Sequence, residues 1–295
     1  METGHVPAKS IPGAIDLRTT LESGQTFLWQ PVNGAHGLES GSKGEWFRTV
    51  GDGEVIEVRE QNGGLDWRSN TDPTPALRAR LGLDAELPRI RSEFPDEPVV
   101  QAATNRFEGL RLVTEPVVPT LFSFILSAQM RIGRIHEMVG ALRETYGEPI
   151  EWRDTVVYDF PSPEKLARAT ETELRDLGLG YRAPYVKATA ELLRDGVVPL
   201  DSVANSPYED AREALTEFVG VGPKVADCVL LFGMGFDEPV PLDTWIRTAI
   251  EEYFPGTSRG TYAETSRAIR DRLGPRPGYA QTYVFTHRRT GGSVE

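Results

Sequence analysis

Cysteine is almost absent from this sequence, and so are long apolar runs. Cys228 is the only cysteine among 295 residues, which excludes an intrachain disulfide and a four-cysteine iron–sulfur cluster. No run of about 18 apolar residues occurs, so we expect no membrane span. The first ten residues lack a basic stretch followed by an apolar one, so nothing points to export and we expect an intracellular protein.

Lysine is scarce as well. Five of the 32 basic residues are lysine and 27 are arginine, against 44 acidic residues, which gives a net charge of −12. The basic surface that usually marks a nucleic-acid-binding protein is therefore missing. An acidic, lysine-poor composition indicates a salt-rich cytoplasm, so we hypothesise that the source is a halophilic prokaryote. Long-range charge is screened there to a few ångströms, and binding would depend on direct contacts.

Short strands and turn signals dominate the first part of the chain. Apolar or alternating segments at 27–29, 46–50, 55–58 and 65–67 are separated by Asn-Gly, Gly-Asp-Gly and Asn-Gly-Gly turns. Helical periodicity prevails after Asp-Pro-Thr-Pro at 72–75. We predict an α+β fold: a flexible tail at 1–13, an N-terminal antiparallel sheet domain with short helices at 14–105, and a helical domain at 106–295.

Two helices can be placed within the helical part. Apolar positions 121, 124, 125, 128, 132 and 135 form one stripe, which predicts a buried helix over residues 120–135. Ser162 precedes Pro163, a pairing that predicts a capped helix start.

Residues 215–244 contain the most informative pattern, a helix, a tight turn and a second helix. Gly220 and Gly222 bracket a hairpin that needs backbone angles other residues resist, and Pro223 suits the first position of a helix. The backbone N–H groups of such a turn point outward and suit a phosphate oxygen. Lys224 follows in the first helical turn, where the partial positive charge of the helix disfavours an ammonium and favours a nucleophilic amine.

Asp243 lies immediately before another helical pattern. Apolar residues recur at 246, 249, 250 and 253, so Asp243 is predicted to be an N-cap, ionised and held in place. An amine nucleophile and a fixed carboxylate beside a phosphate-binding hairpin suit chemistry on a nucleotide sugar. The alternative is a structural hairpin with a surface Lys224 and a capping Asp243.

The run LTEFVGVGPKVADC at 215–228, followed by VPLD at 240–243, resembles the helix-hairpin-helix Gly/Pro-Asp superfamily of base-excision DNA glycosylases. Further blocks are similar to the 8-oxoguanine DNA glycosylases of that superfamily: LESGQTFLW at 21–29, LSAQ at 126–129, GLGYRAPYV at 178–186 and GYAQTYVF at 278–285. The resemblance implies a site in the cleft between the sheet and helical domains. It also implies a bifunctional glycosylase and lyase in which Lys224 forms a Schiff base with the sugar and Asp243 stabilises developing positive charge.

The resemblance further implies how the base is bound. The Gly24 carbonyl would accept the N7 hydrogen that 8-oxoguanine has and guanine lacks. Gln281 would bond the pairing edge of the flipped base, with Phe285 and Cys228 on opposite ring faces. Without the resemblance, Gly24 is an ordinary turn residue, Phe285 a core residue and Gln281 a surface residue.

DNA contacts are implied elsewhere. Gln129 would fill the gap left by the extruded nucleotide. Arg134 would touch the orphaned base, and Tyr181 and Arg182 would enter the duplex, although a plain helix–helix turn remains open for the last two. The backbone of the hairpin glycines Gly220 and Gly222 would meet phosphates. After the capping Asp the family commonly has one residue and then a His that meets a phosphate; here these positions are Thr244 and Trp245, and we expect Thr244 to contact DNA.

The implied partner is damaged double-stranded DNA. We expect the chain to act as a monomer and not to bind a membrane. The resemblance implies no catalytic metal and no organic cofactor, although hairpin carbonyls in this superfamily can hold a structural monovalent cation. Two alternatives stay open. One is a monofunctional alkylpurine glycosylase that uses Asp243 and water, against which Lys224 argues. The other is a non-catalytic helix-hairpin-helix DNA-binding protein.

Overall fold

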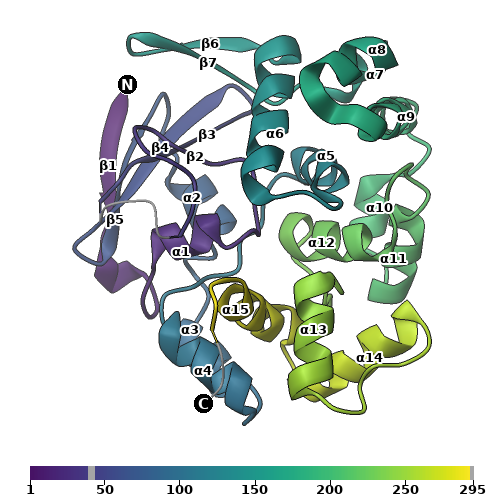
Figure 1. Cartoon of the computed structure of the whole chain (residues 1–295). Helices are drawn as coiled ribbons and strands as arrows, with labels where there is room; N and C mark the ends of the chain where they lie inside the picture. The colour runs from purple at the N-terminus through teal and green to yellow at the C-terminus, as the bar shows by residue number, and fades with distance from the viewer. Residues whose placement is uncertain (39–43, 293–295) are drawn as a thin grey trace.

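The computed structural model describes residues 1–38 and 44–292, and combines an antiparallel sheet with many helices (Figure 1). The predicted α+β class is confirmed. None of the helices in these described ranges is long and apolar enough to cross a membrane. The helices are α1 (Leu17–Glu22), α2 (Thr74–Arg80), α3 (Leu87–Ser92), α4 (Pro98–Arg106), α5 (Val117–Ser127), α6 (Ile132–Tyr146), α7 (Pro163–Arg168), α8 (Glu171–Leu174), α9 (Ala183–Arg194), α10 (Leu200–Ala204), α11 (Tyr208–Leu215), α12 (Pro223–Gly233), α13 (Thr244–Tyr253), α14 (Tyr262–Leu273) and α15 (Pro277–Arg289). Three shorter turns are η1 (Ala8–Ser10), η2 (Arg175–Leu179) and η3 (Gly180–Arg182).

The main sheet has five antiparallel strands in the order β1-β5-β4-β3-β2. Two tight turns set its register, because Asp52 and Gly53 (φ 52° and 75°) and Asn62 and Gly63 (φ 51° and 73°) adopt the left-handed angles of two-residue hairpins. The turn chemistry predicted from these dipeptides is confirmed. The strands are β1 (Glu2–Val6), β2 (Gln30–Pro31), β3 (Phe47–Gly51), β4 (Glu54–Gln61) and β5 (Gly64–Ser69); a separate hairpin is formed by β6 (Pro149–Trp152) and β7 (Thr155–Tyr158).

The prediction of a flexible tail at residues 1–13 is wrong. Glu2 to Val6 form β1, which pairs with β5 from Glu2 opposite Ser69 to Val6 opposite Leu65. Gly4 lies against the indole of Trp67, where an added Cβ would come 2.2 Å from a ring carbon. Residues 2–6 therefore form an edge strand, which is held by backbone hydrogen bonds to β5 and by packing on Trp67. Neither interaction can be predicted from the composition of residues 2–6 alone.

The helix predicted over residues 120–135 is two helices. α5 ends at Ser127 and α6 begins at Ile132, and Gln129 between them has φ +54°. The carbonyl of Ala128, in the break between the two helices, accepts a hydrogen bond from the guanidinium of Arg182, which lies far away in sequence. The apolar positions predicted to form one stripe are divided between α5, α6 and the loop that joins them.

Phe27 to Trp29 do not form the predicted strand, because β2 is confined to Gln30 and Pro31. All three side chains are buried, and the indole of Trp29 donates to Glu115 at 2.7 Å. The predicted cap of α7 is confirmed, since the Ser162 hydroxyl accepts the backbone N–H of Lys165.

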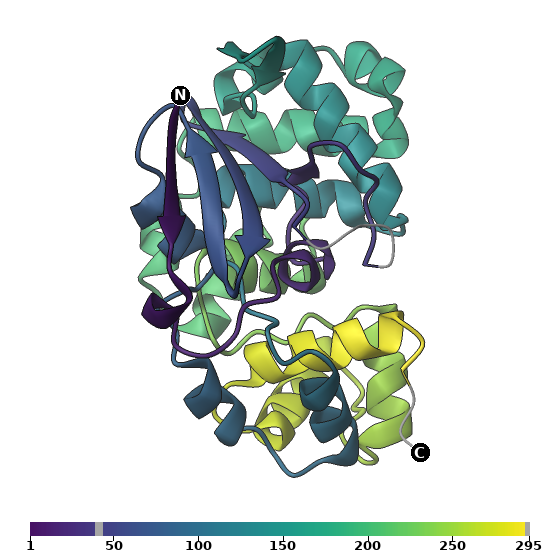
Figure 2. The same ribbon diagram turned by 90° about the vertical axis from the view of Figure 1, so that its left-hand side faces the viewer.

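Two hydrophobic clusters divide the molecule differently from the predicted boundary at residue 105. The larger joins the sheet to α5, α6, α9, α11 and α12. The smaller joins α3 and α4 to α13, α14 and α15, so residues 87–106 pack with the C-terminal helices. Figure 2 shows these two groups as an upper and a lower body. The larger cluster thus draws on residues 6–232, and the smaller one joins residues 87–110 to residues 240–284.

Arg111 ties the N-terminal segment to the loop after α2. Its side chain is fully buried, and its guanidinium donates to the carbonyls of Pro12 (2.7 Å), Ala14 (3.0 Å), Gly82 (2.7 Å) and Ala85 (3.2 Å). Burial lowers the pKa of Arg111 from its ordinary value. The buried charge is tolerated because backbone dipoles surround it.

We expect Arg111→Met to lower the free energy of unfolding by about 3 kcal/mol or more, because buried carbonyl oxygens would lose their donors. Urea unfolding at neutral pH measures this. Arg175→Met is the control, because Arg175 forms an exposed ion pair with Glu171 and its loss should cost less than about 0.5 kcal/mol. Equal effects of the two substitutions would contradict the role given to Arg111.

Candidate active site

The predicted hairpin lies between α11 and α12. Gly220 has φ +86°, and a Cβ there would come 2.8 Å from the Tyr185 ring, so glycine is required on both grounds. Gly222 caps α12 with an extended backbone and nothing within 4 Å of a Cβ. The prediction that both glycines serve backbone angles is therefore right for Gly220 and wrong for Gly222. Pro223 opens α12 as predicted.

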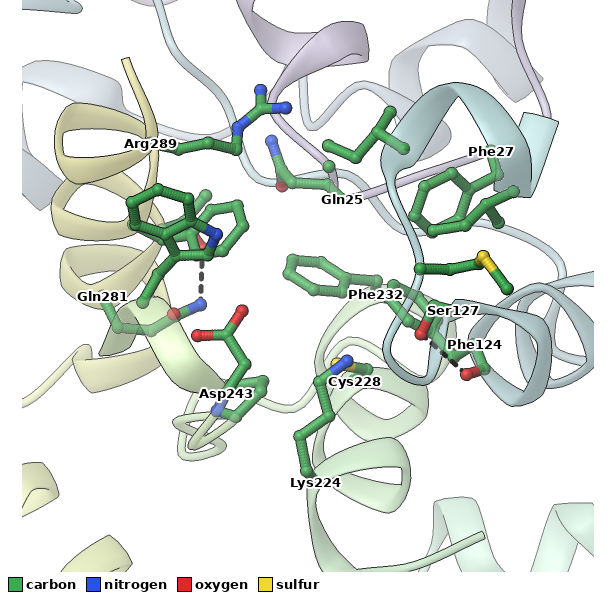
Figure 3. Close-up of a pocket in the computed structure, with 18 of the residues that line it drawn as sticks. Gln25, Phe27, Phe124, Ser127, Lys224, Cys228, Phe232, Asp243, Gln281 and Arg289 are labelled. Atoms are coloured by element: carbon green, nitrogen blue, oxygen red, sulfur yellow. Dashed lines mark hydrogen bonds between the residues drawn. The ribbon is translucent and has the colours of Figure 1, made fainter. Parts of the chain in front are cut away.

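Lys224 lies in the first turn of α12, as predicted, and its side chain enters a cavity (Figure 3). Its amine is 5.4 Å from the centre of the Phe124 ring, and the Cys228 thiol lies one helical turn further along and lines the same cavity. Burial raises the pKa of Cys228 to about 12, so this sulfur stays a neutral thiol. The amine of Lys224 is thus close to an aromatic ring and to a neutral thiol.

Asp243 is the N-cap of α13, as predicted. Its carboxylate accepts the backbone N–H of Ile246 at 2.8 Å. Burial raises the pKa of Asp243, while the N–H groups of Ile246 and Trp245 and the charge of Lys224 oppose that rise. The ionised state predicted from the capping position alone therefore also depends on Lys224.

The cavity has a volume of about 400 Å³, within the ~300–1,000 Å³ range of small-molecule sites. Two groups of predicted residues line it: the catalytic pair Lys224 and Asp243, and the base-binding set Gly24, Cys228, Gln281 and Phe285. In Figure 3, Lys224 and Cys228 come from one side, and Asp243 and Gln281 from the other. Segments more than 250 residues apart in sequence meet here.

The base-binding residues form an aromatic and amide wall. Gly24 has φ +96°, and a Cβ added there would come 3.3 Å from the Phe285 ring. Gln281 is only 4% exposed and donates to the Thr282 hydroxyl at 2.9 Å. The alternatives that place Gln281 on the surface and Phe285 wholly in the core are both wrong.

The residues predicted to touch DNA lie outside the cavity lining. Gln129 and Thr244 are exposed, and Tyr181 is 53% exposed. The Tyr181 hydroxyl donates to the Ala128 carbonyl at 3.4 Å, so Tyr181 and Gln129 lie close together.

The two arginines predicted to contact DNA behave differently. Arg134 pairs with Glu137 at 2.7 Å and donates to the Gly178 carbonyl at 3.2 Å, with its side chain partly exposed. Arg182 is only 2% exposed and donates to the Ala128 carbonyl. In this structure Arg182 supports the turn that presents Gln129.

Several cavity residues were not predicted from the sequence, and Arg289 is the most informative of them. Its guanidinium donates to the Glu22 carbonyl at 2.5 Å and lies 5.8 Å from the Phe285 ring centre. Burial lowers the pKa of Arg289. The spacing of 281, 285 and 289 on one helical face was the available signal. Other missed lining residues are Gln25, Phe27, Phe124, Ser127, Met130, Arg131, Ile132, Ile135, Phe232, Pro241, Trp245 and Thr282.

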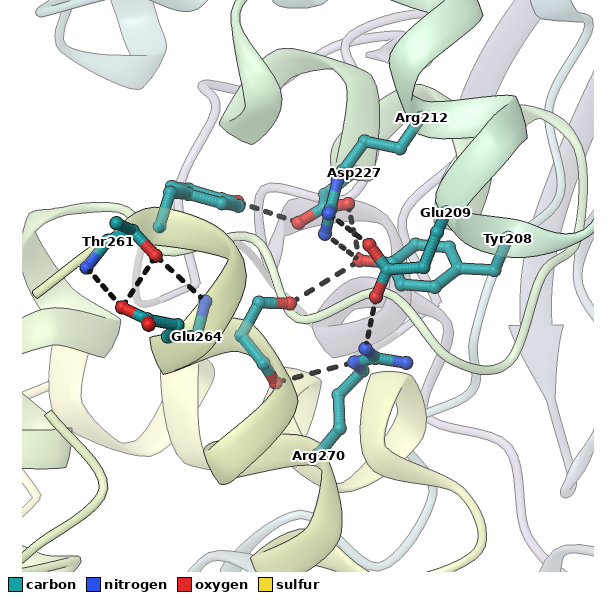
Figure 4. Close-up of polar contacts among 9 residues, drawn as sticks. Tyr208, Glu209, Arg212, Asp227, Thr261, Glu264 and Arg270 are labelled. Carbon is teal, nitrogen blue, oxygen red and sulfur yellow. Dashed lines mark hydrogen bonds and ion pairs between the residues drawn. The ribbon is translucent and has the colours of Figure 1, made fainter. Parts of the chain in front are cut away.

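The buried carboxyl group of Asp227 links α12 to α11 and α14 (Figure 4). Asp227 accepts hydrogen bonds from Tyr208 on α11 at 2.8 Å and from Tyr262 on α14 at 2.7 Å. The Tyr262 hydroxyl accepts the backbone N–H of Leu242, the residue before Asp243, at 3.1 Å. The position of Lys224 relative to Asp243 is therefore fixed by contacts among α11, α12 and α14.

Charged side chains close this network on its outer side. Arg212 donates to the Tyr208 hydroxyl at 2.9 Å and pairs with Glu209, which also pairs with Arg270 at 2.6 Å (Figure 4). Burial is nevertheless the largest influence on Asp227 and raises its pKa to about 7.

We expect Asp227→Asn to change how stability depends on pH. The folded state keeps the Asp227 proton up to about pH 7, whereas an unfolded carboxyl loses it near 3.8. This contribution is full below pH 3.8 and is lost as pH rises through 7, so the wild-type free energy of unfolding should fall relative to the variant by up to ~4 kcal/mol. Urea unfolding at several pH values measures it, and parallel profiles would contradict it.

Comparisons with known proteins agree with this geometry. The sequence model of the family described as "HhH-GPD superfamily base excision DNA repair protein" matches residues 122–275. A "probable N-glycosylase/DNA lyase" of Methanothermobacter thermautotrophicus is 30% identical over 309 aligned residues, which cover 96% of each chain. The "N-glycosylase/DNA lyase" of Saccharomyces cerevisiae is 40% identical over 159 residues, covering 50% of this chain and 42% of the yeast protein.

A solved structure shares the fold. The 8-oxoguanine glycosylase/lyase of Clostridium acetobutylicum, crystallised with double-stranded DNA containing cytosine opposite 8-oxoguanine, superposes with a TM-score of 0.84. The two sequences are 24% identical, and the match covers 95% of this chain and 93% of that one.

Proposed function

Because the chain belongs to the helix-hairpin-helix Gly/Pro-Asp superfamily of base-excision DNA repair proteins, we propose that it excises 8-oxoguanine from duplex DNA and then nicks the strand. The observation that carries this proposal is the cavity that Lys224 and Asp243 share. Its similarity to N-glycosylase/DNA lyases along nearly the whole chain supports the pairing of the two activities.

The proposed chemistry begins with the damaged nucleotide turned out of the duplex into the cavity. As the glycosidic bond breaks, its electron pair leaves with the purine, which takes up a proton. The carboxylate of Asp243 stabilises the positive charge that develops on the sugar. The neutral amine of Lys224 bonds C1′, and ring opening yields a Schiff base. Loss of a C2′ proton then expels the 3′ phosphate.

The proposed base contacts follow from the wall of the cavity. The Gly24 carbonyl accepts the N7 hydrogen of 8-oxoguanine, and an unmodified guanine would leave that buried acceptor unpaired. Gln281 reads the pairing edge. The purine lies between the Phe285 ring and the Cys228 thiol. The raised pKa of Cys228 keeps this thiol neutral, and a neutral thiol suits contact with a ring face.

We propose that one copy of the chain grips damaged double-stranded DNA on the surface around this cavity. The exposed Gln129 and Tyr181 enter the gap left by the flipped nucleotide. Backbone N–H groups at Gly220 and Gly222, together with Thr244, bind phosphates. Arg134 and Arg182 contact the orphaned base, and Arg182 must leave Ala128 to do so.

We expect borohydride to trap wild-type protein covalently on an 8-oxoguanine duplex, because it reduces the Schiff base. Lys224→Gln should abolish the covalent band, and Asp243→Asn should slow its formation by on the order of 10²–10³-fold. Lys165→Gln is the control, because Lys165 pairs with Glu148 on the surface.

Two other results would exclude the proposed mechanism. Excision without trapping would indicate a monofunctional alkylpurine-type glycosylase that uses Asp243 and water. Duplex binding with neither excision nor trapping would indicate a DNA-binding module.

We propose further that the chain works in the cytoplasm or nucleoid of a halophilic prokaryote, on the basis of its −12 charge and five lysines. We also propose a structural monovalent cation at the hairpin, where the Phe218 carbonyl receives one hydrogen bond, from Val221, and keeps a second lone pair.

The fold and excision rate should persist above about 1 M KCl, because screening relieves repulsion between acidic groups. Tetramethylammonium chloride at equal ionic strength is the control for the cation, and it should give a lower unfolding midpoint than KCl. Unfolding above about 1 M KCl would contradict the halophilic origin, and equal midpoints in the two salts would contradict the cation.

A further inference from the structure

Three side chains with metal-ligand chemistry converge behind the Gly24 wall of the cavity. They are Glu22 at the end of α1, His36 in the loop before the undescribed residues 39–43, and His136 on α6, and their ligand atoms all lie within 4.8 Å of one another. The two imidazoles stack with ring centres 3.6 Å apart at 18°. None of the three lines the cavity that holds Lys224.

The cluster is buried and incompletely satisfied. His136 is only 8% exposed, and its Nδ1 has no hydrogen-bond partner among the residues that the structure describes. The Glu22 side chain is 2% exposed, and no lysine or arginine of the described residues forms an ion pair with it. The Nδ1 of His136 is therefore a buried polar atom without a partner, beside a carboxylate that already faces a second imidazole.

The carboxylate is already oriented. One Glu22 oxygen accepts the Gly37 backbone N–H at 2.9 Å, and the other lies 2.9 Å from His36 Nδ1. A metal ion binds a lone pair of an imidazole nitrogen, and the unpartnered Nδ1 of His136 can offer one.

Two imidazoles and a carboxylate form a known ligand set for Zn²⁺. With Zn–N bonds of ~2.0–2.1 Å, tetrahedral ligand atoms stand about 3.4 Å apart. The lone pair of an imidazole nitrogen lies in the plane of its ring, so one of the two stacked rings must turn before both nitrogens can point at one ion. The widest separation must close by about 1.4 Å. His36 can supply that movement, because its side chain is 24% exposed and lies outside regular secondary structure.

We propose that Glu22, His36 and His136 bind one divalent transition-metal ion of the Zn²⁺ class, with the fourth position open to water. The ion would fix the segment that carries Gly24, two residues after Glu22. The Phe27 ring of the cavity wall packs edge-on against His136 at 5.3 Å, and Arg289 holds the Glu22 carbonyl. The site is structural with respect to excision and separate from Lys224 and Asp243.

The test uses full-length protein stripped of metal by a chelator and titrated with ZnCl₂ by calorimetry. We expect one saturable equivalent and a rise in the unfolding midpoint, because an ion bound only by the folded state stabilises it. Co²⁺ should give the visible absorption of a site with nitrogen and oxygen ligands and no sulfur. A cobalt–thiolate band would place the ion at Cys228 and overturn the proposal.

Variants identify the ligands. Glu22→Gln, His36→Gln and His136→Gln should each weaken Zn²⁺ binding at least tenfold, with circular dichroism confirming that each variant is folded. His5→Gln is the matched control, since His5 pairs with Asp66 on the surface, and it should bind as wild type does. Binding that survives in all three cluster variants, or no saturable uptake by wild type, overturns the proposal. Lys224→Gln should keep the site, so that this test stands apart from the excision test.

Discussion

Asp227 has no solvent exposure, and the hydroxyls of two tyrosines from different helices hydrogen-bond its carboxyl group. One of them, Tyr262, also receives the N–H of Leu242, which precedes Asp243 in the chain. Asp227 itself lies one turn of α12 after Lys224. The distance between the amine and the carboxylate of the site is therefore set by side chains that take no part in the chemistry.

The residues that line the cavity come from segments that lie far apart in the sequence. Gly24 follows the first helix, Lys224 begins α12, and Gln281 and Phe285 belong to the last helix. The enclosure that these segments create raises the pKa of Asp243, and the charge of Lys224 counteracts that rise. The protonation state of Asp243 thus depends on Lys224.

Features set by neighbouring residues could be predicted, and features set by distant contacts could not. The cap at Asp243 and the turn at Asn62 follow from local backbone chemistry. The break at Gln129 accompanies a hydrogen bond to Ala128 from Arg182, over fifty residues away. The first strand likewise depends on β5, about sixty residues further along the chain. The base-binding residues were found through resemblance, because periodicity alone favoured core or surface positions.

Lys224 and Asp243 lie on opposite sides of one cavity, and the proposed chemistry depends on this placement. Carbon-13 NMR titration of the Asp243 carboxyl, in wild type and in Lys224→Gln, tests it directly. The account predicts a higher pKa for Asp243 in the variant, because the charge that holds it down is gone. An Asp243 pKa that is the same in both proteins would show that the two groups do not share a site, and would contradict the account.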